Sequence, residues 1–448
     1  MGDAGRTISR GGRARGVISR RSARGSGCRV EIPGAGPRLV RRNPSAPRLS
    51  PRPQLPVSHP APTRDAVLQA LRGVIDPDLG KDIVELGFIT RCEVSDGGAV
   101  DVVINLTTPA CPVKDQMRDQ ARGLIEALDG VTSVEIEMTA EVKGPSGPPR
   151  DAAKDVRHIV AVSSGKGGVG KSTVTVNLAC ALAQTGARVG LLDCDVHGPD
   201  VPMMMGLGGQ PDQAEVDGKT KLVPKERRGV KTMSIGYLVP DDQPVIWRGP
   251  MVHSFIQQML TDVVWGELDY LLVDMPPGTG DAQLSLAQVV PLSGAVLVTT
   301  PQAVAAYDVT KAISMFRQVD VPILGIVENM SGLVMEGTVE GGEAGATVEL
   351  QLGTETAKVQ LEAGGKFRST FEVFGSGGAE RLGQTHGFPV LGQVPIDPGV
   401  RVGGDDGEPI VSAKGDGESA SADALREVAG RLAQRLAVKA FSSLPILD

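Results

Sequence analysis

The sequence predicts an α/β protein that contains a parallel sheet and is preceded by a small α+β domain. From residue 158 onward, short runs of Val, Ile and Leu alternate with helical stretches, as in HIVAVSS, VGLLDCD, YLLVDMP, AVLVTTP and PILGIVENM. Such runs are typical of parallel strands covered by helices on both faces. A glycine-rich loop follows the first run, and a separate α/β pattern ends before residue 143.

That first pattern indicates a compact domain over residues 63–142. It contains a short helix at 63–74, a hairpin at 88–106, an amphipathic helix around Met117 and Leu124, and an alternating strand at 134–138. The GPSGPP stretch then breaks regular structure, so residues 143–157 are predicted to be a linker. The second domain is predicted to span 158–441 and to end in an amphipathic helix, Ser421 to Phe441.

Composition narrows the class of protein further. The 448 residues are 41% hydrophobic and 22% charged, as expected for a largely globular chain. No apolar run reaches the roughly 18 residues of a membrane-spanning helix, so stable membrane insertion is not expected. A disulfide framework is not expected either, because the cysteines are odd in number and scattered, at Cys28, Cys92, Cys111, Cys180 and Cys194.

Charge divides the chain into two unlike parts. Residues 1–60 hold 13 Arg, no Lys and two acids, a net charge of +11, which leaves −18 for the rest because the total is −7. An Arg-rich, acid-poor segment is typical of an organellar transit peptide. The alternative is a disordered basic arm that binds RNA or anionic lipid. The net negative charge of residues 61–448 argues against a nucleic-acid partner.

The strongest chemical signal is GKGGVGKST, which matches G-x-x-x-x-G-K-[ST] between a predicted strand and a predicted helix. In such a loop, backbone N–H groups surround phosphate oxygens, the lysine contacts the β- and γ-phosphates, and the serine contacts Mg²⁺. The sequence therefore predicts binding of ATP and Mg²⁺ by Gly165, Lys166, Gly167, Gly168, Val169, Gly170, Lys171, Ser172 and Thr173.

The second lysine of the loop, Lys166, resembles the deviant Walker A motif of the SIMIBI class of P-loop NTPases. This class includes MinD, ArsA, the nitrogenase iron protein and the Mrp/ApbC iron–sulfur carriers. The resemblance implies a homodimer in which Lys166 reaches the partner's nucleotide. It also implies that Asp195 orients the attacking water and that Asp274, at the end of YLLVD, holds Mg²⁺ through water. Lys166, Lys171 and Asp195 are the expected catalytic residues.

Two further segments match positions that surround the base in this class. Asn329, in VENMS, corresponds to an adenine-contacting residue, and Pro395 and Asp397, in VPID, lie in the loop that closes over the base. The aspartate Asp193, at the end of VGLLD, is either part of the site or a structural cap.

Longer stretches resemble the Mrp/ApbC branch, among them DCDVHGPD, WGELDYLLVDMPPGTGDAQLSLAQ and GIVENMSG. The upstream DPDLGKDIVELGFI and LTTPACPVKDQM resemble the small iron–sulfur cluster assembly domain. Together they are similar to the chloroplast type of Mrp scaffold. The resemblance implies an ATP hydrolase that carries [4Fe–4S] clusters to apo iron–sulfur proteins in the chloroplast stroma, or alternatively in the mitochondrial matrix.

The sequence departs from that branch in one respect. Most Mrp/ApbC carriers have a C-x-x-C pair soon after ENMS, whereas this chain has a cysteine-free insertion at about 335–375, where alternation predicts a β-hairpin. Cys111, which matches the family cysteine in TTPACP, is the candidate cluster ligand. We expect it to be a helix N-cap with a lowered thiol pKa, although it could simply fill a tight loop. Cys92, Cys180 and Cys194 are expected to be packing residues.

Two other functions remain open at this stage. One is a MinD-like ATPase that binds membranes through a basic amphipathic C-terminal helix. The other is a cluster-free, ATP-driven dimerisation switch.

Overall fold

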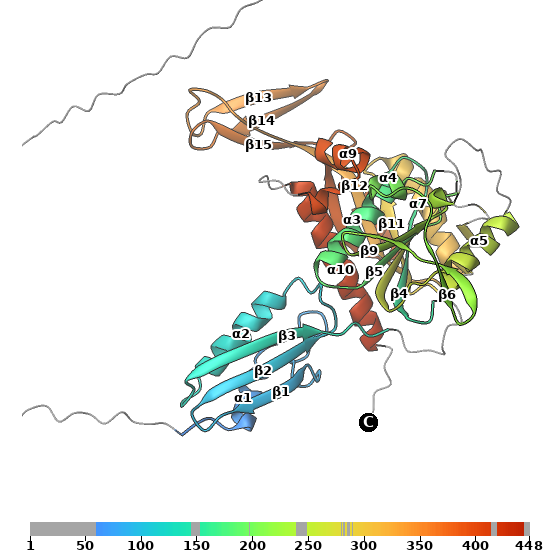
Figure 1. Ribbon diagram of the computed structural model, residues 1–448. Coiled ribbons are helices and arrows are strands. Elements are labelled where there is room, and N and C mark those ends of the chain that lie inside the picture. The colour runs from blue at the N-terminus through green and yellow to red at the C-terminus, as the bar shows by residue number, and fades with distance from the viewer. Residues whose placement is uncertain are drawn as a thin grey trace, which may run out of the picture. The chain divides into compact units, whose positions relative to one another are not determined.

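The computed structural model describes residues 60–442, except for 145–152, 197, 239–248, 279, 281–282, 285–286, 289 and 414–418 (Figure 1). The transit peptide predicted for residues 1–60 lies outside the described residues, apart from Pro60, and so does most of the predicted linker.

The N-terminal sheet has three strands. The strands β1 (Ile89–Val94) and β2 (Ala99–Leu106) form the predicted antiparallel hairpin, and β3 (Ser133–Ala140) pairs in parallel with β2. Two helices, α1 (Arg64–Leu71) and α2 (Lys114–Glu126), contribute buried residues to the same core. The helix–hairpin–helix–strand order predicted from the periodicity is therefore confirmed.

The larger sheet has nine strands in the order β15-β12-β11-β4-β10-β5-β9-β8, with β16 paired to β12. Its strands are β4 (Val156–Ser164), β5 (Val189–Asp193), β8 (Lys225–Arg227), β9 (Val230–Ser234), β10 (Leu268–Asp274), β11 (Gly294–Thr299), β12 (Ile323–Thr338), β15 (Lys366–Phe371) and β16 (Val390–Ile396). The strand pairs from β12 to β9, and β16 with β12, are parallel. This arrangement confirms the predicted parallel α/β fold.

Helices cover both faces of this sheet. Residues of β4 alternate between two cores, Val160 and Val162 entering one and Ile159 and Ala161 the other. The first core contains α3 (Lys171–Gln184) and α10 (Ala420–Ser442), and the second contains α5 (Gly249–Thr261), α7 (Ala303–Gln318) and α8 (Gly378–His386). Burial on both faces explains why the central strands are uninterrupted apolar runs.

Shorter elements complete the fold. They are α4 (Val201–Met204), β6 (Gln213–Val216), β7 (Lys219–Leu222), η1 (Ile235–Tyr237), α9 (Pro398–Asp405) and η2 (Ile410–Ser412).

The predicted insertion forms a β arm, which we define as residues 331–375. The outer half of β12 continues past the parallel sheet and pairs antiparallel with β15 (Figure 1). Between them lie β13 (Thr347–Leu352) and β14 (Glu355–Gln360), which form the predicted hairpin. One strand, β12, therefore belongs both to the parallel sheet and to the arm.

The closing helix α10 is confirmed, but its apolar face is buried. Leu425, Val428, Leu432 and Leu436 are each at most 1% exposed, and they pack in the core that contains α3. This face is not available to a membrane surface, which removes the feature that favoured a MinD-like membrane anchor. Within the described part of the chain, no helix combines the length and apolar character that crossing a bilayer requires.

Replacing Leu432 by Ala tests the role of this helix in stability. We expect a loss of about 2–5 kcal/mol of unfolding free energy, because a buried leucine is removed and a cavity remains. Thermal unfolding followed by circular dichroism measures the change. The control is Arg435→Ala, an exposed position on the same helix, which should melt within a degree or two of the unmodified protein. Equal melting temperatures for the two variants would contradict the packing of Leu432 in the core.

Candidate functional site

The phosphate loop connects the end of β4 to α3. Helix α3 begins at Lys171, and its N-cap, Gly170, has φ +80°, in the left-handed region that glycine tolerates. A Cβ at Gly170 would lie 2.2 Å from Nδ2 of Asn329, and one at Gly165 would lie 2.3 Å from the backbone of Asp308. The loop is therefore closely surrounded: neighbouring backbone requires glycine at 165, and the positive φ favours it at 170.

Lys171 lies in a buried polar network around Asp274. Its Nζ is 2.7 Å from Oδ2 of Asp274, and the Lys171 side chain is only 6% exposed. Ser172 donates a hydrogen bond to the same carboxylate oxygen at 2.6 Å. Thr175 Oγ1 lies 2.8 Å from Oδ1 of Asp274 and also 2.8 Å from the carbonyl oxygen of Lys171. The loop and the end of β10 are thus held together by side chains that could also contact a phosphate and its metal.

Two aspartates, one at the end of β5 and one just after it, lie near this network. Asp195 Oδ2 is 3.8 Å from Nζ of Lys171. Asp193 is fully buried, and it accepts hydrogen bonds from Ser234 Oγ at 2.8 Å and from the Asp195 N–H at 3.0 Å. Burial, and then the charge of Asp274, raise the pKa of Asp193 well above its usual value. Because it accepts the hydrogen bond from the Asp195 N–H, Asp193 helps to position the loop that carries Asp195.

These groups fit a magnesium nucleotide. The Ser172 hydroxyl and the Asp274 carboxylate are oxygen ligands of the kind that Mg²⁺ prefers, directly or through water. Bound Mg²⁺ would neutralise phosphate charge. Lys171 would then exchange its Asp274 partner for phosphate oxygens. The structure records no ion pair for the half-buried Lys166 among the described residues, so its ammonium group has no competing carboxylate there.

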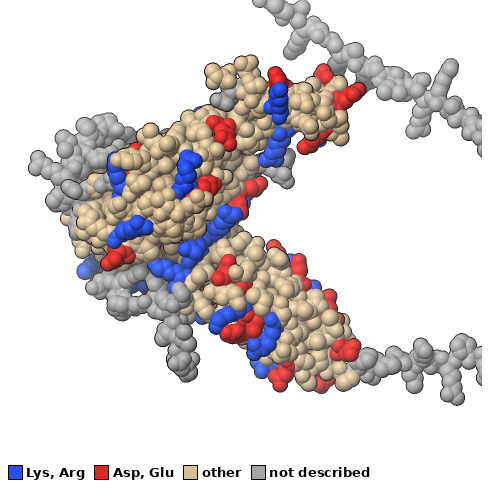
Figure 2. Space-filling model, turned by 180° about the vertical axis from the view of Figure 1, so that it is seen from behind, with Lys and Arg blue, Asp and Glu red and all other residues tan. Residues whose placement is uncertain are grey.

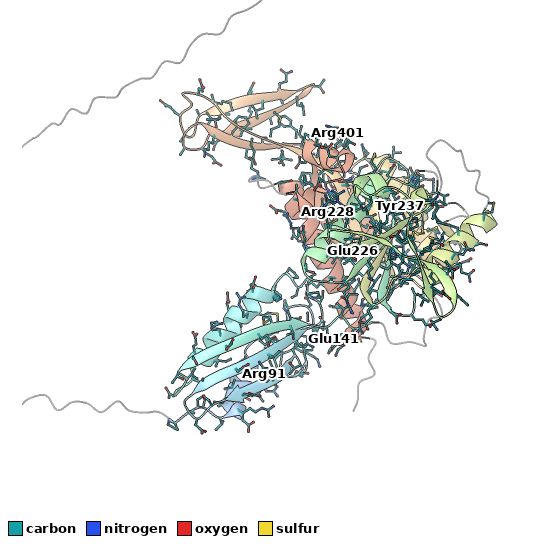
Figure 3. All side chains as sticks on the ribbon, viewed as in Figure 1. Arg91, Glu141, Glu226, Arg228, Tyr237 and Arg401 are labelled. Carbon is teal, nitrogen blue, oxygen red and sulfur yellow. The ribbon has the colours of Figure 1, made fainter. Side chains whose placement is uncertain are left out.

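A cavity of about 370 Å³ adjoins the loop, and its lining includes Gly170 and Thr173. The structure brings Asn329, Pro395 and Asp397 together here, as the sequence led us to expect. Asn329 donates a hydrogen bond of 2.9 Å to the Val169 carbonyl. Asp397 caps α9, whose Arg401 also lines the cavity (Figure 3). The volume falls within the roughly 300–1,000 Å³ of small-molecule pockets.

The predicted environment of Cys111 is wrong. Helix α2 begins at Lys114 and its N-cap is Val113, so Cys111 precedes the helix and is not its cap. Burial is the largest effect and raises the pKa of the Cys111 thiol, while a hydrogen bond from the Val113 backbone N–H lowers it by less. The proline at 112 misled the sequence argument, because it suggested a helix start two residues too early.

The other described cysteines are buried, as expected for packing residues. Cys92 is 6% exposed, and Cys180 and Cys194 are not exposed at all. Burial raises the pKa of Cys180 to about 11 and that of Cys194 well above its usual value. Over the described residues, no group of three or more His, Cys, Asp or Glu side chains is arranged to hold a metal ion.

Several residues of the site were not anticipated from the sequence. Thr175 lies one helical turn after Lys171, a spacing that could have indicated contact with the same carboxylate. Ser234 and Glu328 were missed because Ser234 bonds to Asp193 on another strand, and Glu328 accepts a hydrogen bond from the Ala379 N–H of α8, far along the chain.

The fold and the loop define a P-loop NTPase with two loop lysines. The family described as NUBPL iron-transfer P-loop NTPase matches residues 155–364, and the iron–sulfur cluster assembly protein family matches residues 64–137.

Relatives extend over both regions. An iron–sulfur cluster carrier protein of Deinococcus radiodurans is 47% identical over 85% of this chain and 98% of its own length. One of Synechocystis is 45% identical over 85% and 99%. A chloroplastic Fe–S cluster assembly factor of Arabidopsis thaliana is 41% identical over 78% of this chain and 59% of its own. A nucleotide-binding protein of Archaeoglobus fulgidus, solved with ADP, is 34% identical over 59% of this chain and 93% of its own, with a TM-score of 0.44. The chain belongs to the family of iron–sulfur cluster carrier proteins.

The raised pKa of Cys111 predicts that its thiol reacts slowly with alkylating reagents. At pH 7.5 we expect iodoacetamide to alkylate it at least about tenfold more slowly than free cysteine, because the thiolate is the reactive form. The rate should rise as the pH increases through 9 and above. Mass spectrometry of the Cys111 peptide measures it, and the same protein in denaturant is the control. A rate above that of free cysteine at pH 7.5 would contradict the raised pKa.

Proposed function

We propose that this protein is an ATP-dependent iron–sulfur cluster carrier that delivers clusters to apo iron–sulfur proteins. One observation carries the proposal: the Lys171–Asp274–Ser172 network and its adjoining cavity lie in a chain that is 47% identical to a cluster carrier along 98% of that protein. The cluster is cargo, and ATP is the substrate that drives its loading or release.

The proposed reaction at the nucleotide is slow ATP hydrolysis. Phosphoryl transfer needs positioning and charge more than covalent chemistry. Lys171 would hold the β- and γ-phosphates, and Ser172 and Asp274 would hold Mg²⁺, with Asp274 acting through water. Asp195 would orient the attacking water, and Lys166 would reach the nucleotide of a second copy in a homodimer. Slow turnover suits a cycle whose useful product is a change of dimer geometry.

The cargo is proposed to be a [4Fe–4S] cluster, with Cys111 as a ligand. Such a cluster usually needs four thiolates, and a dimer supplies two copies of Cys111. Cys194 does not fit as a further ligand, because it is fully buried and its thiol pKa is raised. The remaining ligands would come from a recipient protein or a small thiol.

The proposed setting is organellar. The chloroplastic relatives and the Arg-rich residues 1–60 support a transit peptide for the chloroplast stroma, with the mitochondrial matrix as the alternative. Acidic and basic side chains are interspersed on the face seen in Figure 2, in keeping with protein partners rather than nucleic acid.

A cluster-free, ATP-driven switch is the second candidate. It is favoured by the cysteine-free β arm and by the lack of a multidentate metal group among the residues that the structure describes.

Lysine substitutions test the nucleotide site. Lys171→Ala should abolish ATP hydrolysis and weaken ATP binding, because the ammonium group proposed to hold the β- and γ-phosphates is lost. Lys166→Ala should retain binding and lower kcat on the order of 10³-fold, the smaller effect of a charge supplied to the transition state. A phosphate-release assay measures the rates. Lys219→Ala, an exposed lysine on β7, is the control and should match the unmodified protein. Normal turnover by Lys171→Ala would overturn the assignment.

Anaerobic reconstitution with iron and sulfide separates the two candidate functions. The carrier predicts about four irons per dimer with absorbance typical of a [4Fe–4S] cluster, lost in Cys111→Ser and retained in the buried control Cys92→Ser. If no form binds iron while ATP hydrolysis persists, the protein is a switch instead.

A further inference from the structure

The β arm begins and ends at the nucleotide cavity. Met330, just before the arm, and Phe374, at its end, both line the cavity next to the phosphate loop. Met203 and Met204 of α4 also line the cavity. A purine base entering beside Gly170 would therefore meet an apolar slot, one wall of which belongs to the insertion.

The position of Phe374 is unusual for an apolar residue. It lies in a tight turn, in which the Gly375 N–H donates a hydrogen bond of 2.9 Å to the Glu372 carbonyl and Gly375 has φ +77°. Phe374 is 37% exposed. An exposed aromatic ring that faces a cavity gains by covering another flat apolar surface, and every nucleotide base has such a face.

A buried carboxylate fixes this turn relative to the phosphate loop. Glu328 is not exposed at all, and it accepts hydrogen bonds of 2.8 Å from Ser331 Oγ on one side of the arm and from the Ala379 N–H on the other. The next residue, Asn329, donates to the Val169 carbonyl of the loop. Both roots of the arm and the phosphate loop are thus tied through two adjacent residues of β12.

We propose that Phe374 packs against the base of the bound nucleotide, so that the β arm is part of the nucleotide site and is stabilised when the site is filled. The inference rests on the proposed ATP site and adds a base-binding residue from the insertion. It also gives the insertion a role, because anything that displaces the arm would weaken the hold on the base.

Titration calorimetry with the full chain tests the contact. Phe374→Ala should bind ADP about tenfold more weakly, as expected for loss of one aromatic stack on a base. Its affinity for tripolyphosphate should be unchanged, because that ligand has phosphates and no base. Phe374→Trp should retain ADP binding. The matched control is Val373→Ala, at the neighbouring, 44% exposed turn position, which should bind both ligands normally.

Hydrogen exchange tests the link to the arm. ADP should slow amide exchange in the paired segments 333–338 and 366–371 of the unmodified protein, and tripolyphosphate should not. ADP binding by Phe374→Ala within about twofold of normal would overturn the inference and leave the proposed function intact. Failure of the unmodified protein to bind either ligand would overturn both.

Discussion

The contact of the phosphate loop with the end of β10 and the middle of β12 is the constraint on which the site depends. Gly170 has a positive φ and lies against the Asn329 amide, and Lys171 meets Asp274 in a nearly dry environment. An ion pair in such surroundings contributes little net stability, because desolvation offsets the attraction. It does hold the loop in one shape with its cation and carboxylate already in place. Phosphate and Mg²⁺ can then replace one partner each without rebuilding the loop.

The sequence was informative wherever a motif is local. The loop from Gly165 to Thr173 could be located because one continuous stretch of backbone makes the phosphate cradle. The strands could be located because burial on both faces leaves long Val, Ile and Leu runs. Even the hairpin of the insertion followed from alternation in ATVELQL, since β13 has one half-buried face.

The sequence was least informative where contacts join distant segments. Nothing in the sequence around Glu328 indicates its hydrogen bond from the Ala379 N–H. Nothing around Phe374 indicates that it lines the same cavity as Gly170 of the phosphate loop, about 200 residues earlier in the chain. Cys111 shows a related failure. Its proline neighbour suggested that a helix begins beside Cys111, whereas α2 begins at Lys114. The pKa of the Cys111 thiol is therefore raised by burial and not lowered by a helix N-terminus.

The burial of Cys194 between two functional aspartates has a consequence for oxidative stress. Peroxide reacts with accessible thiolates, and Cys194 is neither accessible nor easily deprotonated. Among the four described cysteines, only Cys111 is partly exposed. Damage would reach the thiol proposed to hold cargo before any thiol in the nucleotide machinery. If the proposed function holds, oxidation at Cys111 would remove cargo binding and leave the described thiol beside the nucleotide site intact.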